Sequence, residues 1–387
     1  MSSIELFAGA GGLAIGMARA GFPHSAVIEW DKDACQTIDE NRSHYGAQGE
    51  DFILFQGDAR KFDFSPFAGQ LEVISGGPPC QPFSLGGKHR GNLDKRDMFP
   101  VAVQAVRQAM PKAFIFENVK GLLRQSFVSY FEYIYLQLSY PDVPKRPDEE
   151  WNRHLARLEA LHTSGKRKPT YNVVFRLLNA ADYGVPQKRE RVFLVGFRAN
   201  LGIEWSFPEG THSEDQLLVS KWLTGEYWER HKIPKRRRPP FPEKLRKRIE
   251  RLAQGDFVRS RTLPWVTVRD ALSDLPDPIK QPSNKVLNHV YVPGARVYPG
   301  HTGSPLDEPS KTLKAGDHGV PGGENMMVLP NGSVRYFTAR EAARIQTFPD
   351  DYIFHGSWTE IMRQLGNAVP VKLAEVVARS VAEVLRK

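Results

Sequence analysis

The stretch Gly76-Gly77-Pro78-Pro79-Cys80-Gln81-Pro82-Phe83-Ser84 directly follows an apolar run, Leu71-Glu72-Val73-Ile74. The run predicts a buried strand, and the paired glycines and paired prolines predict that this strand stops abruptly. Cys80 would then lie in a stiff turn at the carboxyl end of a strand, which is the edge where ligands bind in open α/β sheets. This placement suggests a positioned nucleophile; the alternative is a cysteine that falls by chance in a proline-rich turn.

Length and composition predict one large domain with a smaller one, because the chain has 387 residues and 41% of them are hydrophobic. No apolar run approaches the length of a membrane span, and the amino terminus enters a strand pattern at Ser3 instead of forming a signal peptide. Cys35 and Cys80 are the only cysteines. We therefore expect no disulfide framework, no metal site and a cytoplasmic location.

Basic residues are concentrated in one segment. The net charge of the chain is +9, and segment 230–261 holds thirteen Lys or Arg against three acids, a net charge of +10. The rest of the chain therefore carries a net charge of −1. Such a segment is either a solvated face or a surface that contacts the phosphates of a nucleic acid.

The amino-terminal segment has the order of elements of a nucleotide-cofactor site: strand, Gly-rich turn and helix. Residues 3–7 predict a short strand, Ala8-Gly9-Ala10-Gly11-Gly12 predicts a tight turn, and residues 13–20 predict a helix. The glycines let the backbone approach a ligand, and the start of the helix favours a negative group.

A second strand, 26–28, leads to Glu29, which follows Gly9 by 20 residues. An acid at this spacing can accept hydrogen bonds from ribose hydroxyls. Trp30 either stacks on an adenine or packs in the core. A third strand, 52–55, leads to Asp58, which can accept from the amine of an adenine.

A further strand, 113–116, leads to Glu117, so Glu29, Asp58, Cys80 and Glu117 all follow strands of a presumed parallel sheet. A thiolate can add to an electron-poor ring carbon, and a protonated carboxyl group can donate to a ring nitrogen. A pyrimidine attacked at C6 becomes nucleophilic at C5. Beside an adenosyl cofactor, this chemistry leads to methyl transfer.

The chain resembles the DNA (cytosine-5) methyltransferase family over residues 3–387, and especially its bacterial restriction–modification members. The motifs that carry the resemblance occur in the family's order: Phe7-Ala8-Gly9-Ala10-Gly11-Gly12, Glu29-Trp30, Pro79-Cys80-Gln81, Glu117-Asn118-Val119, Gln187-Lys188-Arg189-Glu190-Arg191, 340–349 and Gln364-Leu365-Gly366-Asn367-Ala368-Val369-Pro370. The implied fold is α/β, with a Rossmann-like S-adenosylmethionine-dependent methyltransferase domain and a smaller, mixed and irregular target-recognition domain.

The resemblance implies that Cys80 is the nucleophile and that Glu117 holds the target cytosine. Arg191, together with Arg189, would contact the base or its phosphate; the alternative for these arginines is a surface ion pair with Glu190. The residues that the resemblance assigns to S-adenosylmethionine are Phe7, Gly9, Gly11, Gly12, Leu13, Glu29, Trp30, Asp58, Pro78, Asn367 and Ala368.

Residues 82–98 resemble the family's mobile loop, which closes over double-stranded DNA once the target base has been flipped out of the stack. An ordinary flexible loop is the alternative. The residues that we expect to contact DNA are Ser84, Lys88, Arg90 and Arg96 in this loop, and Arg236, Arg237, Arg238, Lys314 and His318 further along the chain.

The expected domains are a catalytic and cofactor-binding part (1–196), a target-recognition domain (197–335) and a return segment that completes the catalytic domain (336–387). The basic segment falls inside the recognition domain, which favours DNA contact there. We assign no chemical role to residues 124–170, although residues 151–161 predict a helix. Helical spacing of apolar residues across 371–385 predicts a packed helix.

Other functions fit less of the chain. The family's transfer-RNA branch carries an additional Cys-Phe-Thr signature that two cysteines cannot supply at the expected place. A DNA-binding regulator without catalysis would not need Cys80, Glu117 and Arg191 together, and a Rossmann dehydrogenase explains only the first thirty residues. The resemblance further implies a monomer that acts beside a restriction endonuclease without a stable complex.

Overall fold

The computed structural model describes residues 1–46, 51–79, 97–255, 261–282, 285–299, 301–316 and 325–387. It divides the chain into two compact units. The first unit contains residues 1–178, 190–208 and 351–387, and the second contains 179–189 and 209–350. The predicted boundaries lay instead at 196/197 and 335/336, so residues 336–350 pack with the second unit.

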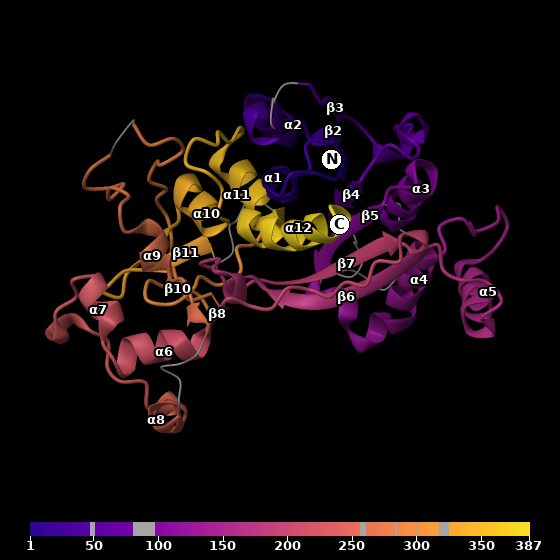
Figure 1. The fold of residues 1–387 in the computed structure, drawn as a ribbon. Coiled ribbons are helices and arrows are strands. Elements are labelled where there is room, and N and C mark those ends of the chain that lie inside the picture. Colours follow the sequence, from indigo (N-terminus) through magenta and orange to yellow (C-terminus); the bar gives the residue numbers. More distant parts are fainter. Residues whose placement is uncertain (47–50, 80–96, 256–260, 283–284, 300, 317–324) are drawn as a thin grey trace. The chain divides into compact units, whose positions relative to one another are not determined.

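A seven-stranded sheet in the order β3-β2-β1-β4-β5-β7-β6 organises the first unit (Figure 1). Its strands are β1 (Ser3–Leu6), β2 (His24–Glu29), β3 (Ile53–Gln56), β4 (Val73–Gly76), β5 (Ala113–Val119), β6 (Tyr171–Asn179) and β7 (Glu190–Arg198). Strands β1 to β5 pair with one another in parallel, whereas β7 is antiparallel to β5. The predicted α/β class is confirmed.

One face of the sheet carries the main apolar core. Ile4 and Leu6 of β1 and Phe114 and Phe116 of β5 alternate with residues of the other face and are fully buried there. Side chains from α3 (Phe99–Ala109), α4 (Val128–Ser139) and α5 (Trp151–Ser164) complete this cluster. Residues 124–170 therefore contribute core packing, and the predicted helix at 151–161 is confirmed.

The carboxyl-terminal segment returns to the start of the chain. In α12 (Val371–Leu385), the apolar residues at helical spacing are buried, and the helix packs along α1 (Gly12–Arg19). The other helices of this unit are α2 (Lys32–Glu40) and α11 (Trp358–Asn367). Cys35 of α2 is buried, and burial raises the pKa of its thiol to about 12, as expected for an inert cysteine.

The second unit is mixed and irregular. Its helices are α6 (Glu214–Trp222), α7 (Glu226–Arg230), α8 (Arg246–Gln254), α9 (Val268–Leu272) and α10 (Ala339–Ile345). Its strands are β8 (His212–Ser213), β9 (Leu263–Pro264), β10 (Ser304–Pro305), β11 (Met326–Val328) and β12 (Val334–Tyr336). Tyr227, Trp228 and Trp265 pack together in one of its apolar clusters.

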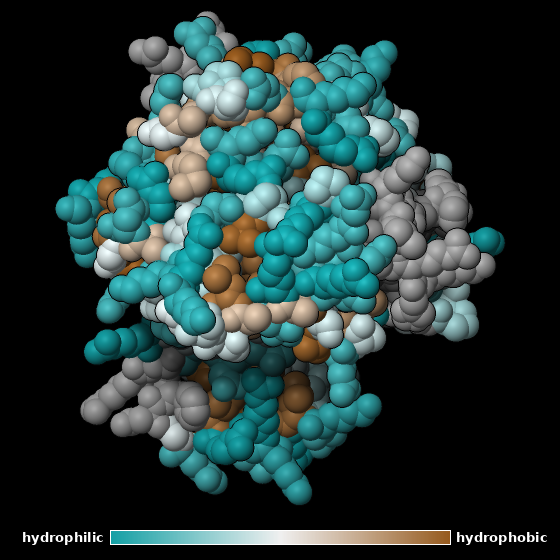
Figure 2. Space-filling view, turned by 90° about the vertical axis from the view of Figure 1, so that its right-hand side faces the viewer, coloured by the Kyte–Doolittle hydropathy of each residue, from teal (hydrophilic) through white to brown (hydrophobic). Residues whose placement is uncertain are grey.

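Seen from the side on which α5 lies in Figure 1, the surface is mostly hydrophilic and its apolar areas are small and separate (Figure 2). Among the described residues, no helix is both long and apolar enough to span a membrane.

Candidate active site

The carboxyl ends of five parallel strands bring the predicted residues to one edge of the sheet. Leu6 of β1 lies beside Ile28 and Gly76, and Gly76 lies beside Phe116. The residues that follow these positions include Phe7, Glu29, Gly77 and Glu117. The structure thus places the Gly-rich turn, the acids and the segment before Cys80 along the same edge.

The Gly-rich turn has a backbone that requires glycine. Gly11 has a φ of 81° and precedes the first residue of α1. A Cβ atom on Gly11 would lie 1.7 Å from the hydroxyl oxygen of Tyr45, so no larger residue fits. Phe7 also has a positive φ, 56°, which is rare for an aromatic residue and marks a constrained turn.

Glu29 is fixed by the backbone around it. Its Oε2 accepts a hydrogen bond from the Gly9 N–H at 2.7 Å, and its Oε1 accepts from the N–H groups of Trp30 and Asp31 at 2.8 and 2.9 Å. Trp30 is 75% exposed, which rules out core packing as its role. The structure therefore presents a buried acceptor and a free aromatic face together, as a nucleoside requires.

Asp58 lies just after β3 and is paired with a nearby cation. Both carboxylate oxygens accept from Arg60 Nε at 2.9 Å, and hydrogen bonds from Arg60 lower the pKa of Asp58. Asp58 is therefore an ionised acceptor. An adenine amine that binds there must share the carboxylate with Arg60.

The segment before Cys80 lies against the end of β5. A Cβ atom on Gly77 would lie 3.3 Å from Oε2 of Glu117. Pro78 and Pro79 follow and are the last described residues before Cys80. Cys80 itself lies outside the described residues, as do the predicted DNA contacts Ser84, Lys88, Arg90 and Arg96.

Glu117 and Arg191 form a buried ion pair across the antiparallel strands β5 and β7. Arg191 Nε lies 2.8 Å from Glu117 Oε1, and both side chains are largely buried. Burial lowers the pKa of Arg191, and the charge of Glu117 opposes this effect. The protonated carboxyl group that we expected at Glu117 stays a prediction, and the structure shows the guanidinium of Arg191 beside it.

The alternative of an ion pair between Arg191 and Glu190 is wrong, because Glu190 pairs with Lys120 at 2.8 Å. Arg189 lies in the second unit, where it is fully buried and its Nη1 donates to the carbonyl of Leu313 at 2.9 Å. The two predicted arginines therefore have different environments, and that of Arg189 favours a structural role.

The return segment lies against the Gly-rich turn at the edge of the sheet. Asn367 is the last residue of α11 and is exposed, whereas Ala368 is buried at its carboxyl end. The Tyr352 hydroxyl donates to the carbonyl of Ala10 at 2.8 Å, inside the Gly-rich turn. Arg363 pairs with Asp31 at 2.7 Å, directly after Trp30. Our sequence reasoning missed Tyr352 and Arg363, and no local pattern marks them.

Comparison with known proteins assigns this arrangement to a family. Residues 1–140 and 149–383 match the model of the C-5 cytosine-specific DNA methylases. The chain belongs to this family. It is therefore a DNA cytosine-5 methyltransferase, as the motifs implied.

Several characterised relatives of this methylase are type II methyltransferases. It is 31% identical to M.PspPI of a Psychrobacter strain over 99% of this chain and 79% of that protein. It is 29% identical to M.NgoMIV of Neisseria gonorrhoeae over 100% and 98% of the two chains. The fold matches Dnmt2 methyltransferase of Schizosaccharomyces pombe with a TM-score of 0.56 at 16% identity, covering 100% and 98% of the two chains.

The predicted DNA contacts of the methylase's second unit have different surroundings. Arg236 and Arg237 are exposed, but Arg238 lies over the Trp228 ring at 6.0 Å and its Nε donates to the Ile233 carbonyl. The backbone of Lys314 is held by Asn325 at 3.0 and 2.9 Å while the residue stays exposed. His318 lies outside the described residues.

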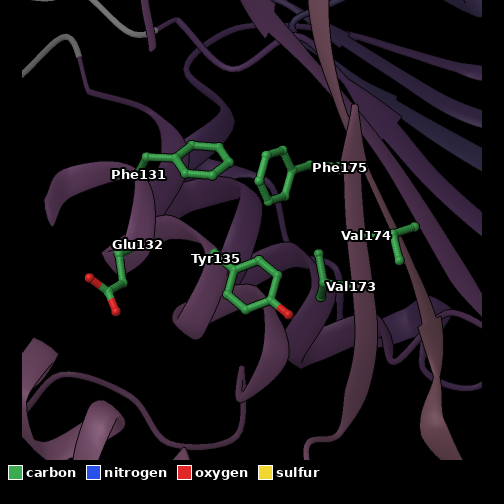
Figure 3. A pocket seen from close by; sticks show the side chains of 6 residues that line it. All are labelled: Phe131, Glu132, Tyr135, Val173, Val174 and Phe175. Carbon is green, nitrogen blue, oxygen red and sulfur yellow. The ribbon is translucent and has the colours of Figure 1, made fainter. Parts of the chain in front are cut away.

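A hollow lies on the first unit. It opens between α4 and β6, where the rings of Phe131 and Phe175 meet edge to face and Glu132 is the charged side chain at its rim (Figure 3). None of the predicted site residues lines it, and it offers no nucleophile. The described residues among those that we predicted for catalysis and cofactor binding lie elsewhere, most of them at the carboxyl edge of the sheet.

Proposed function

We propose that this methylase transfers a methyl group from S-adenosylmethionine to carbon 5 of a cytosine that is flipped out of a specific double-stranded DNA sequence. The observation that carries the proposal is the ion pair between Glu117 and Arg191 beside Gly77 and the prolines that lead to Cys80. A protonated carboxyl group can donate to N3 of a cytosine and accept from its amino group, and a guanidinium can donate to the carbonyl group of the ring.

The residues at the edge of the sheet fit S-adenosylmethionine. The Gly9–Gly12 turn offers its backbone to the ligand, and Gly11 leaves no room for a Cβ atom. Glu29 offers a buried acceptor for ribose hydroxyls, and Trp30 offers an aromatic face for adenine. When bound, S-adenosylmethionine supplies an electrophilic methyl group. Phe7, Leu13, Asp58, Pro78, Asn367 and Ala368 would complete its site.

In the mechanism that we propose, the Cys80 thiolate forms a bond to C6 of the cytosine and thereby makes C5 nucleophilic. Glu117 holds the N3 and amino edge of the ring, and Arg191 stabilises the charge that develops on it. After C5 has accepted the methyl group, it loses its proton to a base. The pair of electrons then expels the Cys80 thiolate and restores the ring.

The names of the relatives support a proposal on the biological role, because M.PspPI and M.NgoMIV are named as type II methyltransferases. We propose that methylation protects DNA from a restriction endonuclease that acts separately, and that the methylase acts as a monomer in the cytoplasm. The second unit would serve as the target-recognition domain.

The decisive experiment expresses the wild type and Cys80→Ser in a host that lacks cytosine methylation and maps 5-methylcytosine at base resolution. We expect one short motif to be fully methylated by the wild type and unmodified with the variant. The proposal fails if purified wild type binds S-adenosylmethionine but marks no DNA, or if Cys80→Ser methylates the same motif at the wild-type rate.

A further inference from the structure

The peptide unit between Ala10 and Gly11 is held at both of its ends. The Tyr352 hydroxyl donates to the carbonyl oxygen of Ala10 at 2.8 Å. The N–H of Gly11 donates to the carbonyl oxygen of Ala8, also at 2.8 Å. Because a peptide unit is planar, these two hydrogen bonds together fix the orientation of this unit within the Gly-rich turn.

The hydroxyl of Tyr352 is in turn oriented by a second tyrosine. Tyr45 Oη lies 2.7 Å from Tyr352 Oη. Tyr352 uses its single proton toward Ala10, so Tyr45 must be the donor to Tyr352. Both side chains are buried, and burial raises the pKa of both, so both hydroxyl groups keep their protons at neutral pH. The two hydrogen bonds therefore run in one direction, from Tyr45 through Tyr352 to the Ala10 carbonyl.

The backbone around Tyr352 is fixed independently of this hydroxyl. Asn41 Nδ2 donates to the carbonyl of Ile353 at 2.7 Å, and Asn41 Oδ1 accepts from the N–H of Ile353 at 2.8 Å. The N–H of His355 donates to Thr37 Oγ1 in α2 at 3.0 Å. Loss of the hydroxyl alone should therefore leave the ring of Tyr352 in its place.

The held peptide unit leads directly into α1. The carbonyl of Gly11 accepts from the N–H of Ile15 at 2.8 Å, which makes Gly11 the residue where the helix starts. The first N–H groups of a helix have no acceptor inside it, and a negative group of a ligand is favoured there. A rotation of the Ala10–Gly11 unit would redirect these N–H groups.

We propose that Tyr352 and Tyr45 are positioning residues that hold the Gly-rich turn in the shape that binds the cofactor, through the hydrogen bond from Tyr352 to the Ala10 carbonyl. This inference rests on the proposed binding of S-adenosylmethionine at this turn. The hydroxyl of Tyr45 acts on the turn only through that of Tyr352. The effects of removing the two hydroxyl groups should therefore not add.

The test uses Tyr352→Phe, Tyr45→Phe and the double variant, each of which loses hydroxyl groups and keeps its rings. Calorimetric titration with S-adenosylmethionine in the absence of DNA measures the Kd. We expect Tyr352→Phe to weaken binding about 10-fold, which corresponds to the loss of one hydrogen bond. Tyr45→Phe should weaken it by at most about threefold, because the bond from Tyr352 to Ala10 remains. The double variant should bind like Tyr352→Phe.

Steady-state methylation of DNA gives a second readout. The KM for S-adenosylmethionine should rise with the Kd in Tyr352→Phe, while kcat at a saturating cofactor concentration stays within about twofold of the wild type. A double variant that is weaker by the product of the two single effects would show that the hydroxyl groups act independently, and this result would overturn the coupling that we infer.

Tyr171→Phe is the matched control. Tyr171 is also a fully buried tyrosine of the first unit, and its hydroxyl donates to the carbonyl of Pro111 at 2.7 Å, before the amino end of β5. We expect Tyr171→Phe to lower the melting temperature about as much as Tyr352→Phe without changing the Kd for S-adenosylmethionine. A merely structural role for Tyr352 would give the same result as this control, and the inference would then fail.

The wild type separates this inference from the proposed function. If the folded wild type does not bind S-adenosylmethionine, the proposed function fails first. If the wild type binds it and Tyr352→Phe binds it equally well, the cofactor assignment stands and the positioning role is wrong.

Discussion

Glu5 is a buried carboxyl group in the middle of β1. It is 1% exposed, and its partner is the Ser75 hydroxyl of the adjacent strand β4. Burial raises the pKa of Glu5 from 4.5 to about 8, the Ser75 hydrogen bond opposes this shift, and the charge of Glu117 adds to it. The folded chain therefore carries Glu5 as a neutral acid at pH 7.

The raised pKa of Glu5 predicts that the free energy of unfolding falls as the pH rises. Because the folded state keeps a proton that the unfolded state has released above pH 4.5, the contribution of Glu5 is fully present below pH 4.5 and is lost toward pH 8. The loss is about 1 kcal/mol per pH unit. We expect urea titrations of the wild type to show this slope between pH 6.5 and 8, and Glu5→Gln to abolish it.

The titrations are restricted to pH 6.5–8 because buried His24 changes the stability in the opposite direction at lower pH. Burial lowers the pKa of His24 from 6.5 to about 4, so its contribution is lost as the pH falls through this range. Glu72→Gln is the control, because Glu72 pairs with Lys112 at 3.0 Å and its pKa is lowered. If Glu5→Gln retains the wild-type slope, Glu5 is not the group that titrates.

At the scale of elements, the docking of α12 on α1 closes the first unit. Gly16 of α1 makes this possible, because a Cβ atom there would lie 2.4 Å from the Cβ of Ala374 and 2.7 Å from the N of Glu375. The contact joins residues near the two ends of the chain. The segment that contains Asn367 and Ala368 comes just before α12 in the chain.

Gly16→Ala tests this contact, because the expected change in stability is opposite in sign to the change in a free helix. Inside a free helix, the change would stabilise by up to about 1 kcal/mol. In this fold we expect it to destabilise by about 1–3 kcal/mol, since the added methyl group overpacks the helix pair. Thermal unfolding measures the difference, and Glu383→Ala on the exposed side of α12 should stay within about 0.5 kcal/mol of the wild type. A more stable Gly16→Ala variant would contradict the close packing.

The sequence predicted those elements whose signal is local. Apolar runs predicted β1, β2, β3, β4 and β5; β1 and β4 are fully buried, whereas β3 lies at the edge of the sheet and is only partly buried. Acids at strand ends marked the site, because parallel strands share an edge. The contact from Tyr352 to Ala10 spans 342 residues, so only the folded chain brings these residues together.

The second unit was predictable only as an irregular region. Its strands are two or three residues long, too short for an alternating pattern. Its interior depends on polar contacts such as those of Arg189 with Leu313 and of Gln187 with Gln346 at 3.0 Å. Of the arginines that we predicted to contact DNA or its base, Arg189 is fully buried, whereas Arg238 is half-buried over the ring of Trp228.

At the scale of the whole molecule, the excess of positive charge is concentrated in one segment of the second unit. Segment 230–261, within the second unit, carries a net charge of +10, while the remainder of the chain carries −1. Many of its cations are already paired, as Arg248 is with Glu214 and Asp215 at 2.8 and 2.5 Å. Arg236 and Arg237 remain exposed, and no ion pair is recorded for either among the described residues.

If Arg236 and Arg237 each neutralise a DNA phosphate, their loss must change the salt dependence of binding. Each phosphate contact contributes about 0.9 to the slope of log K against log salt concentration. We therefore expect Arg236→Ala/Arg237→Ala to reduce the magnitude of that slope by about 2 in fluorescence-anisotropy titrations between 50 and 200 mM salt. Affinity for unrelated DNA sequences should weaken to the same extent, because phosphates carry no sequence information.

Arg19→Ala/Arg379→Ala removes the same charge from the first unit, where both arginines pair with Glu375 at 3.8 and 2.7 Å. A slope that falls equally in both double variants would mean that net charge alone acts at long range. A slope that falls only with Arg236 and Arg237 locates phosphate contacts in the basic segment. Equal slopes in all three proteins would remove these arginines from the DNA interface, because a contact that releases counterions cannot be lost without changing the salt dependence.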